Sequence, residues 1–421
     1  MLSQKHSLNE WLTFVEAQHP QSVIELGLGR MRTMVERLGI EFDCPVIVVG
    51  GTNGKGSTCM MLESIYRAAG YEVGTHTSPH MLRFNERARV NGEEIDDESM
   101  VRAFEKVEAK RGDLPLTYFE FTALAIFVAF IEKQLDVVIL EVGLGGRLDA
   151  INVLEPTASI VTTVGVDHEA FLGNTRDSVG WEKAHIYRKG KPAICADRNP
   201  PVKLVQYALG LGASLRVYGD AFDVEEAGDQ FTFKMGELVW TLPRPALHGR
   251  NQIDNASGVL AIVASLLEYL PVTQGQIAQG LRSVRLTGRF ECRGIAPLLY
   301  LDVGHNPHAA LVLAENLKTL PAEGKTLAVF GMLADKDMQE VIEIVRPMID
   351  EWYVAGLPPP RGASLPLLVR TMREAGVEAF RIIENESVVA ALAKARENAS
   401  INDKIIVFGS FVTVTDVLPL L

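Results

Sequence analysis

The segment 45–73 combines an apolar run, a glycine-rich turn and a helical pattern, in an order that suits phosphate binding. The glycines of the turn are Gly50, Gly51, Gly54 and Gly56. Backbone N–H groups at the start of such a helix attract anions, because they have no partners and the helix dipole favours negative charge. Lys55 would reach the outer phosphates of a nucleotide, and the hydroxyl of Ser57 or Thr58 would face Mg²⁺. The segment therefore predicts a phosphate-binding loop.

The spacing departs from the common G-x-x-x-x-G-K-[ST] pattern at two positions. Val49 stands where that pattern has its first glycine, and Gly56 separates Lys55 from Ser57. A glycine-rich connection with a solvated lysine is the plainer alternative. An apolar run before the turn and a helical pattern after it favour the nucleotide interpretation, which leaves the reaction open.

Polar side chains also end three other apolar runs. Glu141 closes the run 136–141, Ser78 follows the run 72–74, and His168 follows the run 158–166. The carboxyl ends of parallel strands meet at one edge of a sheet, and carboxylate and hydroxyl oxygens are ligands that Mg²⁺ prefers. Glu141 is therefore expected to hold Mg²⁺, with Ser78 and His168 as candidate ligands. The alternatives are a strand-capping glutamate, a turn serine before Pro79 and, for His168, a group that orients water or a surface histidine.

A similar loop, LDVGHNPHAA, lies near the C-terminal third of the chain. Asp302, His305 and Asn306 follow an apolar run there, and Pro307 suits the first position of a helix. These side chains would bind ribose or orient a nucleotide. Capping of the following helix by Asn306 is an equally weighted alternative.

Apolar runs alternate with helical patterns throughout, which predicts an α/β protein with mainly parallel sheets. We expect a P-loop-type sheet domain followed by a smaller Rossmann-like α/β domain. The strands expected in the first are 46–49, 137–141, 159–163, 193–196 and 214–217, and those in the second are 298–303, 326–330, 351–354 and 404–408. Two hairpins are expected, over 87–95 around Asn91-Gly92 and over 231–242 around Gly236. We predict an ATP-binding domain over residues 1–284, a linker over residues 285–290 and a C-terminal domain over residues 291–421.

Composition excludes several classes of protein. With 421 residues, 47% of them hydrophobic and 22% charged, the chain is long enough for two or three globular domains. A net charge of −12 disfavours nucleic acid as a partner. The four cysteines have no metal-ligand spacing, no signal peptide is visible, and the longest apolar run is too short to cross a membrane. We therefore expect a cytoplasmic protein.

The chain resembles the folylpolyglutamate synthase and dihydrofolate synthase family, within the Mur ligase superfamily, over nearly its whole length. Eleven sequence blocks in family order carry the resemblance: LGLGRM (26–31), GTNGKGS (51–57), TSPHMLRFNER (77–87), TYFEFTALA (117–125), EVGLGGRLDA (141–150), VDHEAFLG (166–173), EKAHIYRKGKP (182–192), TGRFE (287–291), DVGHNPHA (302–309), FGMLADKD (330–337) and FGSF (408–411).

The resemblance implies an ATP-dependent ligase that forms C–N bonds. It would add L-glutamate to dihydropteroate, giving dihydrofolate, and to tetrahydrofolate, giving folylpolyglutamate, through an acyl phosphate. ATP and two Mg²⁺ ions would be the cofactors, and residues 291–421 would form the glutamate-ligase domain. The partners would be these small molecules, without nucleic acid or membrane, and we expect a monomer.

The resemblance also assigns roles to matching residues. Lys55, Lys183 and His168 would be catalytic, with Lys183 at the position of a lysine that the family carries as an N6-carbamate. ATP would contact Gly54, Lys55, Gly56, Ser57, Asn255, Arg289 and Asp302. The metal ions would contact Ser78, Glu141 and His168. The pterin would contact Leu26, Gly27, Leu28, Thr117, Tyr118, Phe119, Glu120, Leu148, Asp149 and Ala150.

Departures and alternatives remain. Ile151 stands where the family often has threonine, and His185 replaces a frequent glycine. The alternative functions are a monofunctional folylpolyglutamate synthase, a Mur-type ligase of peptidoglycan precursors and a non-catalytic nucleotide-binding module. Near the first hairpin, Arg83, Arg87 and Arg89 would receive an acidic polyglutamate tail or form a solvated charged face.

Overall fold

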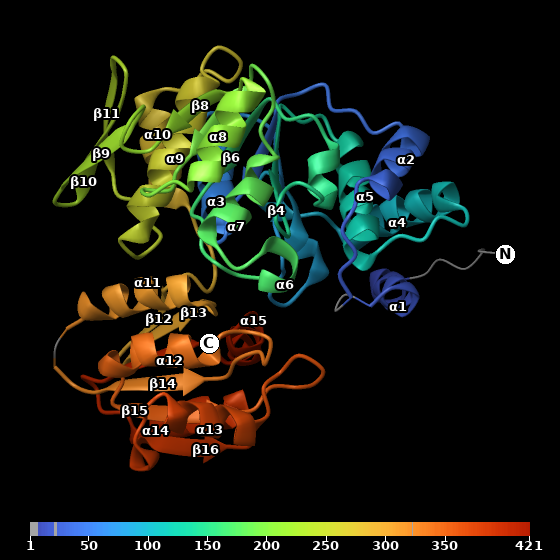
Figure 1. Ribbon diagram of the computed structural model, residues 1–421. Helices are drawn as coiled ribbons and strands as arrows, with labels where there is room; N and C mark the ends of the chain where they lie inside the picture. The colour runs from blue at the N-terminus through green and yellow to red at the C-terminus, as the bar shows by residue number, and fades with distance from the viewer. Residues whose placement is uncertain (1–6, 21–22, 322) are drawn as a thin grey trace. The chain divides into compact units, whose positions relative to one another are not determined.

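The computed structural model describes residues 7–20, 23–321 and 323–421. It divides into two compact units (Figure 1). Unit 1 comprises Met1–Ala246 and Ile253–Val284, and unit 2 comprises Leu247–Gln252 and Arg285–Leu421. Each unit has its own sheet, which confirms the predicted α/β class with a larger and a smaller part.

Unit 1 is built on an eight-stranded sheet in the order β4-β3-β2-β5-β1-β6-β7-β8. Six of these strands pair in parallel. The two antiparallel pairs are β2 with β3 and β3 with β4, and the second is the hairpin that the Asn91-Gly92 turn predicts. The strands are β1 (Val46–Gly50), β2 (Val73–His76), β3 (Ala88–Val90), β4 (Glu93–Glu94), β5 (Val137–Glu141), β6 (Ala158–Val161), β7 (Pro192–Cys195) and β8 (Ser214–Val217).

The strand register decides which side chains meet at the carboxyl edge. Val49 of β1 pairs with Glu141 of β5 and with Ile160 of β6. His76 of β2 pairs with Leu140 of β5. The loops that follow β1, β2, β5 and β6 therefore begin at the same edge of the sheet, where ligands of such sheets bind.

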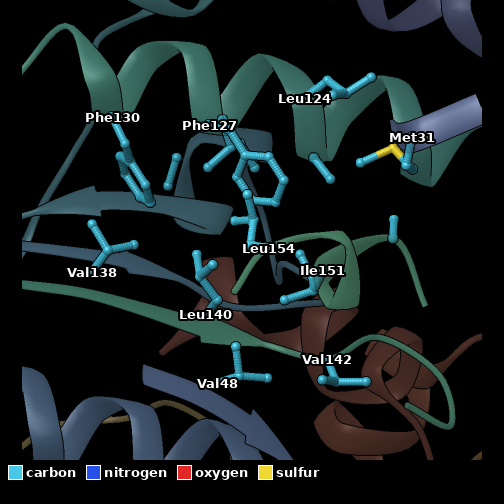
Figure 2. Packing of buried hydrophobic residues seen from close by; sticks show 14 of the residues in the cluster. Met31, Val48, Leu124, Phe127, Phe130, Val138, Leu140, Val142, Ile151 and Leu154 are labelled. Atoms are coloured by element: carbon cyan, nitrogen blue, oxygen red, sulfur yellow. The ribbon is translucent and has the colours of Figure 1, made fainter. Parts of the chain in front are cut away.

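The helices of unit 1 pack on this sheet. Figure 2 shows Phe127 and Phe130 of α5 above Val138 and Leu140 of β5, with Val48 of β1 nearby. Thr117 caps α5 and exchanges hydrogen bonds with Glu120, which fixes where this apolar helix begins. The helices are α1 (Leu8–Gln18), α2 (Gly29–Leu38), α3 (Lys55–Ala68), α4 (Asp97–Arg111), α5 (Tyr118–Ile131), α6 (Glu169–Leu172), α7 (Arg176–Ala184), α8 (Val202–Leu211), α9 (Asn251–Ser265) and α10 (Gln274–Ser283).

A small antiparallel sheet completes unit 1. The predicted hairpin is formed by β10 (Gln230–Met235) and β11 (Leu238–Pro243), with the turn at Gly236. A third strand, β9 (Asp223–Ala227), pairs with β10 and was missed. Its sequence DVEEA is mostly acidic and exposed, so it lacks the apolar alternation that indicates a strand.

Unit 2 has a six-stranded sheet in the order β12-β13-β17-β14-β15-β16. All neighbouring pairs are parallel except β12 with β13. The strands are β12 (Glu291–Ile295), β13 (Leu298–Asp302), β14 (Thr326–Phe330), β15 (Glu351–Ala355), β16 (Ile382–Asn385) and β17 (Lys404–Phe408). The helices are α11 (Pro307–Lys318), α12 (Met338–Val345), α13 (Leu365–Glu374), α14 (Val388–Asn398) and α15 (Phe411–Val417).

The most apolar helix, α5, has 14 residues, which is fewer than the roughly 20 that a membrane-spanning helix needs. None of the helices in the described parts of the chain is long and apolar enough to span a bilayer. The apolar run 121–131 instead forms the buried side of α5 against the sheet, as the sequence predicts.

Candidate active site

The glycine-rich loop joins β1 to α3 and depends on glycine at two positions. Gly51 has φ +145°, and a Cβ atom there would lie 1.8 Å from Thr162 Oγ1. Gly54 caps α3 with φ +87°, and a Cβ atom there would lie 2.3 Å from Asn255 Oδ1. The structure therefore brings Asn255 of α9 against the loop, next to the residues predicted to hold phosphate.

Hydrogen bonds fasten this loop to the segment that follows β6. The Thr162 hydroxyl donates to Asn53 O at 2.7 Å, and Thr52 N donates to Thr163 O at 2.7 Å. The Thr52 hydroxyl donates to Gly165 O at 3.0 Å. Such a loop has its backbone set before any anion arrives, which is what preorganised phosphate binding needs.

Two lysines converge on the same carbonyl oxygen of the loop. Lys55 Nζ donates to Gly51 O at 3.1 Å and to Thr52 O at 3.0 Å, and Lys183 Nζ donates to Gly51 O at 2.9 Å. Lys183, on α7, is only 3% exposed. Burial and then the charge of Lys55 lower the pKa of Lys183 to about 7. Its amine is therefore in part neutral near neutral pH.

The three predicted metal ligands lie at the carboxyl edge of the sheet. Glu141 is buried at the end of β5, and Ser78 N donates to its Oε2 at 3.1 Å. His168 precedes α6 in a left-handed conformation, with φ +53°, and lines the same cavity as Ser78. Within the described residues, no group of three or more His, Cys, Asp or Glu side chains gathers to hold a metal. A buried carboxylate, a hydroxyl and an imidazole are nevertheless donors that Mg²⁺ or Mn²⁺ accepts, so these residues fit a divalent ion.

A cavity of about 220 Å³ opens beside these residues. Besides Ser78 and His168, its wall contains eight of the ten residues predicted to contact pterin: Leu26, Thr117, Tyr118, Phe119, Glu120, Leu148, Asp149 and Ala150. The remaining two lie outside this wall. Gly27 N donates to Leu148 O at 3.3 Å, and Leu28 lines a separate cavity of about 470 Å³ with Arg32 and Arg147.

The carboxylates on the cavity wall already have partners. Glu120 accepts from Arg30 Nε at 2.8 Å and from Thr117 N at 2.8 Å. Asp149 accepts from Leu144 N at 2.8 Å and from Ile151 N at 3.0 Å, while burial raises its pKa to about 6. These two carboxylates therefore hold backbone and an arginine in place, in addition to any contact with a ligand.

In unit 2, Asp302 connects the segment that carries Arg289 to the loop that follows β13. Its Oδ2 accepts from Phe290 N at 2.9 Å, and its Oδ1 accepts from Gly304 N at 2.7 Å. Burial raises the pKa of Asp302, and neighbouring Arg289 opposes this effect. The guanidinium carbon of Arg289 lies 5.3 Å from the Phe411 ring centre. Asn306 caps α11 by accepting from Ala309 N at 2.9 Å, so the capping alternative for this residue is correct.

Sequence reasoning missed Thr162 and Thr163, whose hydroxyl groups both donate to Asn53 O. Both residues directly follow the apolar run of β6. The signal that found Glu141, a polar residue at the end of an apolar run, was present here too.

Comparisons with known proteins cover the whole chain. The family model described as "Mur ligase middle domain" matches residues 49–263, and the one described as "Mur ligase, glutamate ligase domain" matches residues 288–411. The dihydrofolate synthase/folylpolyglutamate synthase of Escherichia coli is 40% identical over 98% of this chain and 94% of its own length. The protein of the same name from Haemophilus influenzae is 36% identical over 97% of this chain and 96% of its own length.

Solved structures agree. Escherichia coli FolC in complex with DHPP and ADP superposes with a TM-score of 0.92 at 39% identity, over 99% of this chain and 97% of the other. A bifunctional folylpolyglutamate synthase/dihydrofolate synthase with Mn, AMPPNP and L-glutamate bound superposes with a TM-score of 0.91 at 39% identity, over 99% of this chain and 98% of the other.

Proposed function

The chain belongs to the dihydrofolate synthase/folylpolyglutamate synthase family, whose domains are those of the Mur ligases, and we propose that it joins L-glutamate to dihydropteroate and to tetrahydrofolate. It is a ligase that forms C–N bonds and uses ATP and a divalent metal ion. The observation that carries this proposal is the 220 Å³ cavity. Its wall combines eight of the ten predicted pterin residues with Ser78 and His168, two of the predicted metal ligands.

We propose that the reaction has two steps. A carboxylate oxygen of the acceptor bonds to the γ-phosphorus of ATP, and the bond from that phosphorus to ADP breaks. The amine of L-glutamate then attacks the acyl carbon of the acyl phosphate, phosphate leaves, and the amine loses a proton. Because carboxylate and phosphate repel each other, charge neutralisation and positioning supply most of the rate.

The residues around the loop suit this task. Lys55 and the N–H groups of Gly54, Gly56 and Ser57 would hold the phosphates, with Asn255 against the loop. Two Mg²⁺ ions held by Ser78, Glu141 and His168 would neutralise charge on the phosphates. An imidazole that ligates a metal is not available as the base for the incoming amine, so His168 is proposed as a ligand.

We propose that Lys183 carries a carbamate in the active enzyme. Only a neutral amine attacks CO₂, and burial beside Lys55 lowers the pKa of Lys183 enough to provide one near neutral pH. The carbamate would replace a second buried cation by an anion, next to Lys55. This would remove the repulsion between the two amines that meet at Gly51 O.

For unit 2, we propose that residues 291–421 form the glutamate-ligase domain and that 285–290 is the linker. Arg289 and Asp302 would contact ATP. Hydrogen bonds to Asp302 hold the Arg289 segment beside the loop after β13, so the two residues would act on the same ligand. We further propose a monomer that acts in the cytoplasm.

A glutamate-addition assay with two acceptors tests the function. Purified protein with ATP, Mg²⁺ and L-glutamate should extend both dihydropteroate and tetrahydrofolate, with one ADP released per glutamate added. Extension of tetrahydrofolate alone would identify a monofunctional folylpolyglutamate synthase. Extension of a UDP-muramoyl acceptor instead would identify a Mur-type ligase. No ADP with any acceptor would leave only the non-catalytic nucleotide-binding module.

A further inference from the structure

Arg87 is a buried cation on the wall of the 220 Å³ cavity. Its side chain is only 2% exposed, and it is the one lysine or arginine among the described residues of this wall. No carboxylate of a described residue lies within ion-pair distance of it. Its Nε donates to His80 Nδ1 at 2.8 Å. A ring nitrogen that accepts this hydrogen bond carries no negative charge, so His80 forms no ion pair with Arg87. Glu141 and Glu86 attract the charge of Arg87 from beyond ion-pair distance.

The two neighbouring arginines differ from Arg87. Arg83 is exposed and pairs with Asp97 at 3.1 Å and with Glu94 at 3.7 Å. Arg89 pairs with buried Glu63 at 3.7 Å. Of the three arginines whose sequence suggests a role with an acidic substrate, only Arg87 is both buried and without a carboxylate partner in the described chain.

The surroundings of Arg87 hold its guanidinium in place. Its backbone oxygen accepts from Thr77 N at 3.3 Å and lies 2.7 Å from His76 Nδ1. Its guanidinium carbon lies 5.8 Å from the Phe84 ring centre and 6.0 Å from the Tyr118 ring centre. A guanidinium fixed in this way loses little side-chain freedom when a ligand binds, because that freedom is already lost.

Arg87 is the cation that the described wall of the cavity can offer to an anionic ligand. A buried charge is costly unless an opposite charge or hydrogen bonds compensate it. Glu120 and Glu25 of the wall are both paired with Arg30, and Asp149 accepts two backbone N–H groups. Arg87, by contrast, has no carboxylate of a described residue at ion-pair distance, and Glu141 and Glu86 attract its charge only from farther away.

We propose that Arg87 binds the carboxylate of the acceptor, the group that ATP phosphorylates. This proposal rests on the proposed function, because it takes dihydropteroate or a folate as the occupant of the cavity. A guanidinium presents two parallel N–H groups that match the two oxygens of a carboxylate. Arg87 thereby holds the carboxylate in the cavity that Ser78 also lines, and the backbone N–H of Ser78 contacts Glu141.

Equilibrium binding without nucleotide tests this role, since no chemistry is then needed. Dihydropteroate and its neutral carboxamide are titrated into wild type, Arg87→Gln and the matched control Arg83→Gln. Arg87→Gln should weaken binding of dihydropteroate by about 30-fold or more, as expected for removal of one partner of a buried charge pair. Binding of the carboxamide should change less than about threefold, well within the scatter for a lost neutral contact. Arg83→Gln should bind both ligands as wild type does.

Equal losses for both ligands, or no loss for dihydropteroate, would overturn the proposal. If Arg87→Gln does not fold by circular dichroism, a crystal structure of wild type with dihydropteroate decides. A carboxylate oxygen within hydrogen-bond distance of a terminal nitrogen of Arg87 supports the proposal, and a carboxylate held elsewhere overturns it. Failure of wild type to bind either ligand would instead count against the proposed function.

Discussion

At the scale of single residues, Lys55 and Lys183 share one acceptor, Gly51 O, but differ in burial. Lys55 lies at the start of α3 and is half-buried, so its amine can turn from the loop carbonyls to a phosphate. Lys55→Ala should therefore lower turnover by about 100-fold or more while the fold is kept, the usual cost of removing one electrostatic donor. ADP release with both acceptors measures this, and exposed Lys189→Ala is the control. Retained activity in Lys55→Ala would remove the phosphate-binding assignment.

Lys183 predicts a pH dependence of stability in the unmodified protein. Its pKa is lowered from 10.5 to about 7 in the folded state, so between these values the unfolded chain binds a proton that the folded chain does not. The contribution of Lys183 to the free energy of unfolding must therefore rise with pH between about 7 and 10.5. Below about pH 7 its amine is charged in the folded state too, and its burial then costs the most stability. Compared with Lys183→Met, wild type should gain unfolding free energy from about pH 7 to pH 10.

Urea unfolding of both proteins in CO₂-free buffer measures this difference. A difference that stays flat or falls with rising pH would contradict the lowered pKa. The same two proteins, assayed for ADP release in bicarbonate buffer, test the carbamate separately, since Lys183→Met should be inactive and wild type should carry the added mass of CO₂ on one lysine.

At the scale of elements, the loop between β1 and α3 requires glycine because the segment after β6 lies against it. Gly51→Ala would place Cβ 1.8 Å from Thr162 Oγ1 at a φ that other residues rarely adopt. We expect a loss of about 1–3 kcal/mol in the free energy of unfolding from the backbone alone. We also expect weaker ATP binding, because the Thr162 and Asn53 contact would be displaced.

The matched control is Gly210→Ala, near the end of α8. A Cβ atom there meets nothing within 4 Å. Alanine at this position should stabilise the protein by about 0.4–1 kcal/mol by restricting the unfolded chain. Thermal and urea unfolding of the two variants should thus shift in opposite directions. A Gly51→Ala protein as stable as wild type would show that the loop is free to move.

The sequence predicted elements well where local pattern decides them. Every strand expected in the two main sheets is present, because most of them are continuous apolar runs followed by glycine or a polar residue. The missed elements are β9, β12, β16 and α15. They are short and lie at sheet edges or at the chain end, where pairing with a neighbour matters more than composition. Arg87 could not be separated from Arg83 and Arg89, because only the folded chain shows which of these side chains is buried and which form ion pairs with carboxylates.

At the scale of the whole molecule, each unit has a hydrophobic core of its own. The core of unit 2 includes Trp352, which packs on Phe330 with ring centres 5.4 Å apart, and Phe408, 4.8 Å from Phe330. The fragment 285–421 contains all six strands of this sheet. A domain with its own sheet and core can fold alone.

We therefore expect the fragment 285–421 to fold and to unfold in one cooperative thermal transition. Trp352→Ala should abolish that transition, because truncating a buried tryptophan costs about 3–5 kcal/mol, much of the stability of a domain this size. Phe380→Ala is the matched control, since Phe380 is 82% exposed and contributes little burial. Differential scanning calorimetry of the three fragments measures both effects. A wild-type fragment without a transition would mean that unit 2 needs unit 1, or its own segment Leu247–Gln252, to hold its core together.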